Sequence, residues 1–405
     1  METSARLRLR CLHSAKTGFA HKRQPAWAIR SYAKRQICRR EQGLNKRLDN
    51  YPIRQSGTHA IRYAANIINH QHAVAFSMSA SHLSSPHRQI SVTAPARLHM
   101  GFLDLNGSLG RRFGSIGVAV NELATRLLVS GSDSGLQAEG PQADSALKSA
   151  RLFCDALGTG HDVHIRIEEA IPGHIGLGSG TQLALAVGAG LAAYFGLELS
   201  VREIAGAVSR GARSGIGIAV FEQGGFIVDG GRGAQTETPP VISRISVPEE
   251  WRIILLLDAR GQGLHGAQEI DAFRKLPPFP AGETARLCHR VLMQALPAIA
   301  EADLSGFGSV ITDLQKSVGD HFAPVQGGRF TSPEVGDALD WLAGQGAAGL
   351  GQSSWGPTGF CLVENDTLAT KLMDSARARY PMLTLMLSTA RNQGAEVVCT
   401  QAVSA

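Results

Sequence analysis

The chain lacks the cysteine patterns that would indicate a zinc site or a disulfide framework. Its six cysteines are scattered over 405 residues, and none forms a C-x-x-C pair. Long apolar runs are scarce too, since the one that could suggest a membrane span, residues 183–199, is interrupted by Gly188, Gly190 and Gly196. No stretch reads as a secretory signal. We therefore expect a cytoplasmic protein without a membrane span.

Acidic residues are nearly absent from the first 90 positions. This segment holds 16 Lys and Arg against 3 Asp and Glu, so the remainder of a chain with formal charge +6 is acidic, at −7. The basic charge therefore predicts no nucleic-acid partner for the body of the protein. We expect residues 1–88 to be disordered. A translation start assigned too early, with Met78 as the true start, is the favoured explanation; a nucleic-acid-binding arm and a transit peptide remain alternatives.

The chain as a whole has the composition of a folded globular protein, with 43% hydrophobic and 18% charged residues. Strands and helices occur without the regular spacing of a doubly wound sheet, which predicts an α+β fold in two domains, residues 89–245 and 246–405. The segment around residues 238–251 carries three prolines and is predicted to cross between them.

Local patterns predict most of the elements. We expect strands at 89–105 and 161–170, a second and a third strand within 114–132, and a hairpin at 219–231. Helices are expected over 145–158, ending at Gly158, over 181–195, and over 200–211. Ser200 and Glu203 have the spacing of a capping box at the start of the last one. Further elements are predicted in the second half at 251–259, 282–303, 332–346, 358–364, 365–380 and 395–400.

A glycine-rich loop, "IPGHIGLGSGTQ", stands directly before the apolar helix at 181–195. The first amides of a helix are unpaired and carry partial positive charge, and glycines let an anion approach them. Gly176, Gly178 and Gly180 are therefore predicted to surround a phosphate, with Ser179 and Thr181 as hydroxyl donors. The alternative is a glycine turn that only packs a helix onto a sheet. The spacing matches neither a Walker loop nor a dinucleotide-binding fingerprint.

Three motifs in order resemble those of the GHMP kinase superfamily. They are "APARLHMGFLDL", the loop "PGHIGLGSG" followed by a small-residue helix, and "GLGQSSWGPTGF". The resemblance implies a two-domain GHMP-kinase-like fold with the active site between the domains. A GHMP kinase carries an aspartate after its second motif, where this chain reads Ser214 to Ile218 without an acid; Glu222 and Asp229 remain alternatives for that role.

Within the superfamily, "ARLHMGFLDLNG", "RRFGSIGVAV", "RSGIGIAVFEQGGFIVDGG" and "GQSSWGPT" resemble the β-ribofuranosylaminobenzene 5′-phosphate synthases. The match covers residues 90 to 400. It implies a pentosyltransferase that joins 4-aminobenzoate, or a close hydroxybenzoate, to phosphoribosyl pyrophosphate and releases CO₂ and pyrophosphate, towards tetrahydromethanopterin. An ATP-dependent kinase of the same fold and a non-catalytic binding or regulatory protein are the alternatives.

That chemistry needs cations for a charged leaving group and for a carboxylate. Four arginines lie inside the matching motifs and are our candidates, although an arginine can also simply pair with a surface acid. They are Arg97, Arg111, Arg112 and Arg213. Arg97 and Arg213 are proposed as catalytic and the other two as substrate-binding.

Two histidines and one acid complete the expected catalytic set. His99 and His174 could give charge or a hydrogen bond to pyrophosphate, although a strand histidine is more often a packed residue. Asp104 could bind Mg²⁺, the one cofactor we expect; the alternative is an acid that closes the turn before "NGS".

The third motif is expected to bind substrate through Gln352, Ser353, Ser354 and Thr358. Trp355 could stack on a benzoate ring or could fill the core between domains. A homodimer is one possible assembly of such a protein, and the sequence does not specify the oligomeric state.

Overall fold

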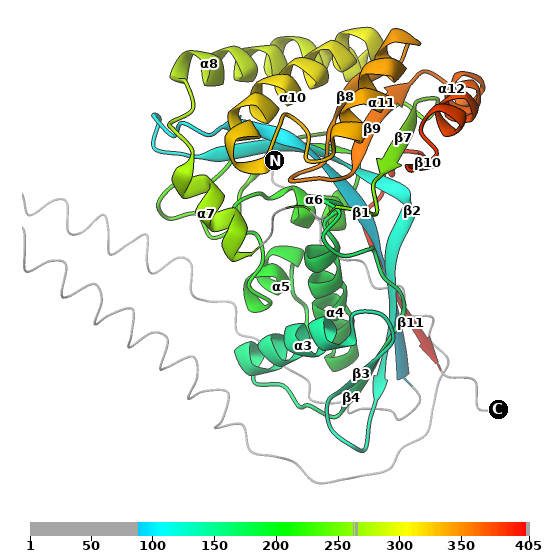
Figure 1. The fold of residues 1–405 in the computed structure, drawn as a ribbon. Helices are drawn as coiled ribbons and strands as arrows, with labels where there is room; N and C mark the ends of the chain where they lie inside the picture. The colour runs from blue at the N-terminus through cyan, green and yellow to red at the C-terminus, as the bar shows by residue number, and fades with distance from the viewer. Residues whose placement is uncertain (1–87, 262, 264–265, 402–405) are drawn as a thin grey trace, which may run out of the picture. The chain divides into compact units, whose positions relative to one another are not determined.

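The computed structural model describes residues 88–261, 263 and 266–401, and all of these belong to one compact unit. The predicted disorder of residues 1–87 and the Met78 start lie outside the described residues, whereas Arg88, predicted to be disordered as well, is the first residue of a strand. Figure 1 shows the order of the elements.

Six strands from the first half of the described chain and the last strand form a seven-stranded sheet. Its order is β11-β1-β2-β4-β3, with β5 pairing with β2 and β6 with β5. All neighbours are antiparallel except β3 and β4. The strands are β1 (Arg88–Asp104), β2 (Phe113–Gly131), β3 (Gln137–Glu139), β4 (Val163–Glu169), β5 (Phe226–Asp229), β6 (Val241–Ile245) and β11 (Glu396–Gln401).

The prediction of two strands within 114–132 is wrong, because β2 is a single long strand. Its pairing with β1 shifts where Pro95 faces Ala124 and Ala96 faces Val120, so the strand accommodates extra residues there. Asn121 and Glu122 in this irregularity are polar and exposed, which resembles a strand end in the sequence. A bulge thus lets the strand bend without ending.

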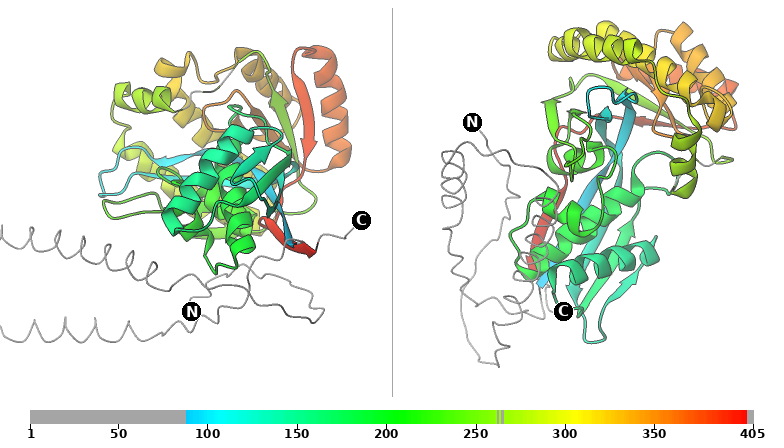
Figure 2. Two further views of the ribbon diagram at one scale, coloured as in Figure 1. Left: turned by 90° about the horizontal axis from the view of Figure 1, so that it is seen from below. Right: turned by 90° about the vertical axis from the view of Figure 1, so that its left-hand side faces the viewer.

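Helices α3 (Ala143–Leu157), α4 (Ser179–Phe195) and α5 (Val201–Ala207) pack with strands β1, β2 and β4 in one hydrophobic cluster. Figures 1 and 2 show the green helices beside the cyan strands. α4 is buried along nearly its whole length. A Cβ on Gly190 would lie 2.7 Å from Val129 Cγ2, so this glycine permits close contact with the sheet. The capping box of Ser200 and Glu203 is confirmed.

The predicted hairpin at 219–231 is also wrong. Its first half lies in helix α6 (Ile216–Gln223), and only the second half forms a strand, β5. Residues Ile216–Phe221 are all buried. An apolar run buried on every side has no periodicity that distinguishes a helix from a strand.

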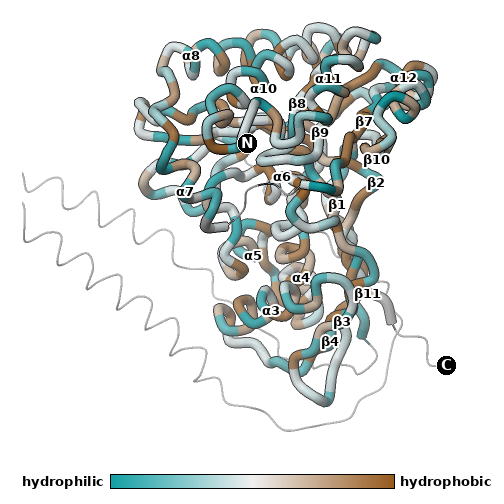
Figure 3. Tube along the Cα trace, in the orientation of Figure 1, coloured by the Kyte–Doolittle hydropathy of each residue, from teal (hydrophilic) through white to brown (hydrophobic). Residues whose placement is uncertain are grey.

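A second sheet has the order β10-β7-β9-β8 and is antiparallel throughout. Its strands are β7 (Arg252–Leu257), β8 (Ala348–Gln352), β9 (Gly359–Val363) and β10 (Thr384–Ser388). β7 is hydrophobic on both faces and appears brown in Figure 3. Ile254 and Leu256 pack with helices α11 (Pro333–Gly344) and α12 (Asp366–Arg379), while Ile253 and Leu255 join the cluster of α10 (Leu304–Gln326).

The last described residues return to the first sheet. Strand β11 pairs antiparallel with β1, with Ile90 opposite Cys399. The expected second domain, residues 246–405, therefore contributes a strand to the sheet of the first. The boundary at residue 245 stays a prediction.

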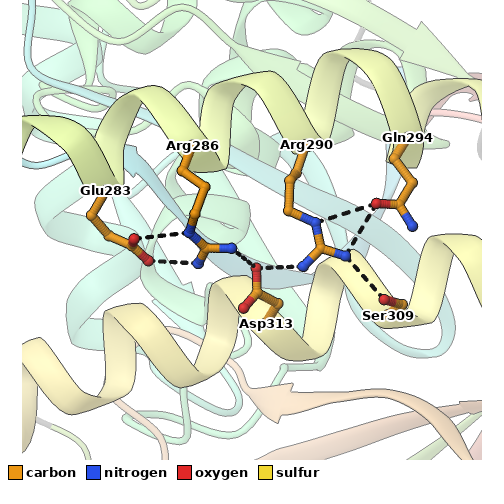
Figure 4. Close-up of polar contacts among 6 residues, drawn as sticks. All are labelled: Glu283, Arg286, Arg290, Gln294, Ser309 and Asp313. Carbon is orange, nitrogen blue, oxygen red and sulfur yellow. Dashed lines mark hydrogen bonds and ion pairs between the residues drawn. The ribbon is translucent and has the colours of Figure 1, made fainter.

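The long helix α10 has no counterpart among the predicted elements. The helix predicted over 282–303 is divided into α8 (Ala281–Arg290), a π turn at Val291–Ala295 and α9 (Leu296–Ala300). An ion-pair network fastens this region to α10: Asp313 accepts from Arg286 and Arg290, and Arg286 also contacts Glu283 (Figure 4).

Helix α10 in turn holds the first strand. Gln315 Nε2 donates to the carbonyl oxygen of Met100 at 2.6 Å, and its Oε1 accepts from the amide of Gln352 at 2.9 Å. One side chain therefore connects β1 to β8. Helix α7 (Ala267–Lys275) completes the described helices. None of the helices in the described residues is long and apolar enough to cross a membrane.

Gly117 on β2 lies opposite His99 on β1 and is a test of this packing. A Cβ there would lie 2.5 Å from the carbonyl oxygen of Leu98, so we expect Gly117→Ala to lower the free energy of unfolding by about 1–3 kcal/mol. The control is Gly206→Ala on α5, where nothing lies within 4 Å of the added Cβ; it should raise stability by about 0.5–1 kcal/mol. Urea unfolding followed by circular dichroism measures both. Equal midpoints for Gly117→Ala and the natural protein would contradict the expected contact.

Candidate active site

The loop between β4 and α4 leaves the start of the helix open. Gly178 is the N-cap in the left-handed region, with φ 82°, and offers no side chain to the helix amides. The amides of Thr181 and Gln182 both donate to the carbonyl oxygen of Gly178. Within the described residues, the amides of Ser179 and Gly180 have no hydrogen-bond partner. The first turn carries no acidic residue. Partial positive charge therefore stays uncompensated at this end.

A cavity of about 170 Å³ lies against this loop. Most of its lining was predicted from the sequence. It comprises Arg97, His174, Gly176, Gly178, Ser179, Gly180, Thr181, Arg210, Gly263, Ser354, Trp355 and Gly356. No carboxylate occurs among these residues. The cavity suits an anion.

Arg97 reaches the loop from strand β1. Its Nη1 donates to the carbonyl oxygen of Gly176 at 2.6 Å, and its backbone amide donates to that of Leu177 at 3.1 Å. Burial lowers the pKa of Arg97 from 12.5 to about 10, while Glu269 acts in the opposite direction. The guanidinium group is therefore still charged at neutral pH.

The third motif closes on the same carbonyl. Ser353 Oγ donates to Gly176 O at 2.8 Å and accepts from the amide of His99 at 3.0 Å. The amide of Ser354 donates to the carbonyl oxygen of His99 at 3.1 Å. The three motifs that the sequence separates thus meet at one point.

Trp355 is mainly a core residue. Its side chain is only 4% exposed, its ring lies 4.4 Å from that of Phe322 and 5.6 Å from that of Phe273, and its Nε1 donates to Glu269. This packing corresponds to the core-filling alternative, although the residue also borders the cavity.

Gln352 and Thr358 are buried and do not line the cavity. Gln352 Oε1 accepts from the amide of Thr331 at 2.7 Å, so this side chain braces the motif. The carbonyl of Thr358 accepts from the amide of Ser353. Both residues support the loop of the third motif, and their expected contact with substrate stays a prediction.

His99 does not share the cavity at the glycine loop. It lines a small pocket with Gln315 that adjoins this cavity, since Ser354 and Trp355 border both, and it is 4% exposed. Burial, and then the charge of Arg97, lower the pKa of His99 to about 3, so the imidazole is neutral. The neutral imidazole adds no positive charge for a bound pyrophosphate, while the predicted hydrogen bond from His99 to pyrophosphate stays a prediction.

The remaining expected arginines have protein partners. Arg111 donates to the carbonyl oxygens of Gly230 and Gly231, and Arg112 to that of Leu105. Neither lines the cavity.

Arg213 pairs with Glu269 at 2.7 Å and does not line the cavity either. Its guanidinium group lies 5.9 Å from the centre of the Phe273 ring. Glu269 accepts from Trp355 as well, so it joins two residues that the sequence placed in separate motifs.

Asp104 closes a turn. Its Oδ1 accepts from the amides of Asn106 and Gly107 at 2.8 and 2.7 Å, which is the alternative considered for it. Within residues 88–261, 263 and 266–401 no group of three or more His, Cys, Asp or Glu side chains could hold a metal ion. Asp104 as a Mg²⁺ ligand stays a prediction.

Comparison with known proteins gives the chain its relatives. The GHMP kinases N terminal domain matches residues 144–225, and the GHMP kinases C terminal domain matches residues 295–381. β-Ribofuranosylphenol 5′-phosphate synthase of Methanothermobacter thermautotrophicus is 34% identical over 297 residues, 68% of this chain and 89% of the relative. The synthase of the same name from Methanocaldococcus jannaschii is 34% identical over 70% of this chain and 92% of its own.

The chain belongs to this synthase family. Its fold is that of the GHMP kinases, shared with Lactococcus lactis galactokinase at a TM-score of 0.58 and 14% identity over 76% of this chain and 95% of the galactokinase. The α+β fold and the family are therefore as the sequence predicted.

The kinase-type acid is absent from the cavity of this synthase family member. Asp229 accepts from Ser115, Ser214 and the amides of Gly215 and Gly231, and burial raises its pKa. Its carboxylate thus organises the start of α6. Glu222 accepts from Gln223 and does not line the cavity.

Sequence reasoning missed Arg210, Gly263 and Glu269. Arg210 follows α5 outside the quoted motifs, and only its place before Gly211 signals a fixed turn. Gly263 donates its amide to the carbonyl oxygen of His174 and so borders the loop. Glu269 lies 56 or more residues from the two side chains it contacts, and no local pattern indicates it.

Gly178 is the decisive glycine of the loop. A Cβ there would lie 3.0 to 3.2 Å from Arg97 Cγ, Nε and Cζ. We expect Gly178→Ala to weaken the binding of inorganic pyrophosphate at least about tenfold, because it displaces a charge-assisted donor. Gly196→Ala is the control, since Gly196 shares a positive φ of 68° but has nothing within 4 Å. Calorimetry gives the affinities, and equal losses in both variants would contradict a role for Arg97.

The buried neutral His99 predicts an acid-sensitive stability. The unfolded chain binds a proton to His99 near pH 6.5, while the folded protein resists it down to about pH 3. Stability is therefore fully present above pH 6.5 and should fall by up to about 1.4 kcal/mol per pH unit below it. His99→Gln should flatten this slope between pH 6 and 4 in thermal melts, whereas His161→Gln, at an exposed position, should not. Parallel slopes for the natural protein and His99→Gln would refute the assignment.

Proposed function

We propose that the chain is a pentosyltransferase that joins phosphoribosyl pyrophosphate to 4-aminobenzoate, or to a close hydroxybenzoate, and releases CO₂ and pyrophosphate. The cationic cavity without carboxylates at the start of α4 is the observation that supports this function. The relatives, named for a ribofuranosylphenol 5′-phosphate, support an aromatic acceptor and a phosphoribosyl donor. Such a step would serve tetrahydromethanopterin synthesis.

The leaving group explains the cavity. When the bond between ribose C1′ and the pyrophosphate oxygen breaks, its electrons pass to the pyrophosphate, and negative charge grows there. Arg97 and the amides of Ser179 and Gly180 face that charge without competition from an acid. The residues are fixed before the substrate binds, so little reorganisation accompanies the reaction.

The acceptor needs no general base. The ring carbon that bears the carboxylate forms the new bond to C1′, and the bond to CO₂ then breaks, so that its electrons restore the aromatic ring. No proton leaves the ring carbon. This balance suits a site without a nearby aspartate and disfavours a kinase, which must orient or deprotonate an acceptor hydroxyl.

Arg213 is our candidate for the acceptor carboxylate. Its guanidinium group is already paired with Glu269, whose carboxylate oxygen lies 2.7 Å from Nη2. An arginine shared with a second acid binds a carboxylate less tightly than a free one does. Such a grip orients the substrate but releases it once the carboxylate becomes neutral CO₂. His174, which lines the cavity, is proposed to contact the pyrophosphate.

Mg²⁺ enters the proposal only with the donor. The cavity lining offers hydroxyl groups of Ser179 and Thr181 but no carboxylate, so these residues do not fit an ion held by protein alone. An ion carried by pyrophosphate would offset its charge, and no step rests on it. The cytoplasmic location and the homodimeric state stay predictions.

Release of labelled CO₂ tests the reaction. We expect 4-aminobenzoate labelled in its carboxyl group to lose the label only when phosphoribosyl pyrophosphate is present, and Arg97→Ala to lower kcat/KM by about 10²- to 10³-fold. Arg166→Ala, an exposed arginine on β4, should have no effect. The same assay with labelled 4-hydroxybenzoate ranks the two acceptors.

Two results would replace this function. Consumption of ATP with a phosphorylated product would establish the kinase instead. Saturable binding of phosphoribosyl pyrophosphate with no release of CO₂ from either acceptor would establish a non-catalytic binding protein.

A further inference from the structure

The arginines expected to meet phosphate are mostly committed to protein groups. A guanidinium group held by carbonyl oxygens or a carboxylate has fewer N–H donors for a ligand. The pairs are Arg97 with Gly176, Arg111 with Gly230 and Gly231, Arg112 with Leu105, and Arg213 with Glu269. Of these four, only Arg97 lines the cavity at the glycine loop.

Arg210 lines that cavity and is different. Within the described residues its side chain makes no hydrogen bond and no ion pair. Its Nη2 lies 3.9 Å from the position that a Cβ on Gly180 would occupy. The guanidinium group therefore faces the first turn of α4, where the amides of Ser179 and Gly180 are open.

The backbone at Arg210 is fixed. Its amide donates to the carbonyl oxygen of Ala205 at 2.8 Å, and Ser209, with φ 55°, donates to Gly206 at 3.1 Å. A Cβ on Gly211 would lie 2.6 Å from Ile218 Cδ1, so the glycine lets the chain pass close to α6. A turn closed on both sides fixes the backbone from which the Arg210 side chain extends beside the first turn of α4.

We propose that Arg210 binds the pyrophosphate of the donor, together with Arg97 and the first amides of α4. This inference rests on the proposed function and assigns the second cation of the leaving-group site to a residue outside the three motifs. Arg97 is partly used by Gly176, whereas Arg210 offers its whole fork of donors.

The binding of inorganic pyrophosphate tests the assignment without turnover. In calorimetry on the full chain, Arg210→Ala should bind pyrophosphate about 10- to 30-fold more weakly than the natural protein, and Arg210→Lys about threefold more weakly, because a point charge cannot bind in a fork. Arg151→Ala is the matched control, an exposed arginine on α3 with no side-chain partner in the described residues. It should change nothing.

Kinetics provide the second measurement. KM for phosphoribosyl pyrophosphate should rise with the loss of affinity in Arg210→Ala, while KM for the aromatic acceptor stays within about twofold. Because Arg210 is exposed, the melting temperature of the Arg210→Ala variant should match that of Arg151→Ala. A pyrophosphate affinity of Arg210→Ala within twofold of the natural protein would overturn the assignment.

The two proposals can fail separately. If no CO₂ is released but pyrophosphate binds through Arg210, the pentosyltransferase reaction is wrong and the binding role of Arg210 stands. If CO₂ is released and Arg210→Ala binds pyrophosphate normally, the reaction stands and Arg210 has no part in it.

Discussion

The carbonyl oxygen of Gly176 accepts hydrogen bonds from two residues far away in the chain. Arg97 lies 79 residues before it and Ser353 lies 177 residues after it. Ser353 is bound in turn to the backbone of His99, two residues beyond Arg97 on the same strand. A first strand, a helix-capping loop and a strand connection of the second sheet are thereby held in one arrangement. The cavity at the start of α4 exists because these three segments meet.

The electrostatics of this meeting point are unbalanced within the protein. Arg97 is desolvated, and its nearest acidic influence is Glu269, which binds Arg213 rather than Arg97. The helix adds open amides and no acid in its first turn. A folded protein that leaves cations and donors unpaired in a cavity loses some stability there, and a bound anion restores it. The arrangement is thus one in which ligand binding and folding stability are linked.

Much of the architecture follows from local patterns. Strand β4 is evident from its alternation, helix α5 from its capping box, helix α4 from the glycines at its two ends, and β7 from its short apolar run. The failures have definite causes. Polar Asn121 and Glu122 lie in an irregularity of β2, and in the sequence they resemble the end of a strand. Helix α6 is an apolar run without periodicity. Helix α10 is interrupted by glycines and contains Pro324, which conceals its pattern.

The sequence by itself determined the loop, its glycines and the family motifs, because the start of a helix and a positive φ depend on neighbouring residues. Only the tertiary structure decided which charged side chains face the cavity. His99 is neutral in an adjoining pocket, Arg213 is bound to Glu269, and Arg210 lies beside Gly180. The partners of a side chain are set by segments that pack together from distant parts of the chain, and no spacing in the sequence encodes that contact.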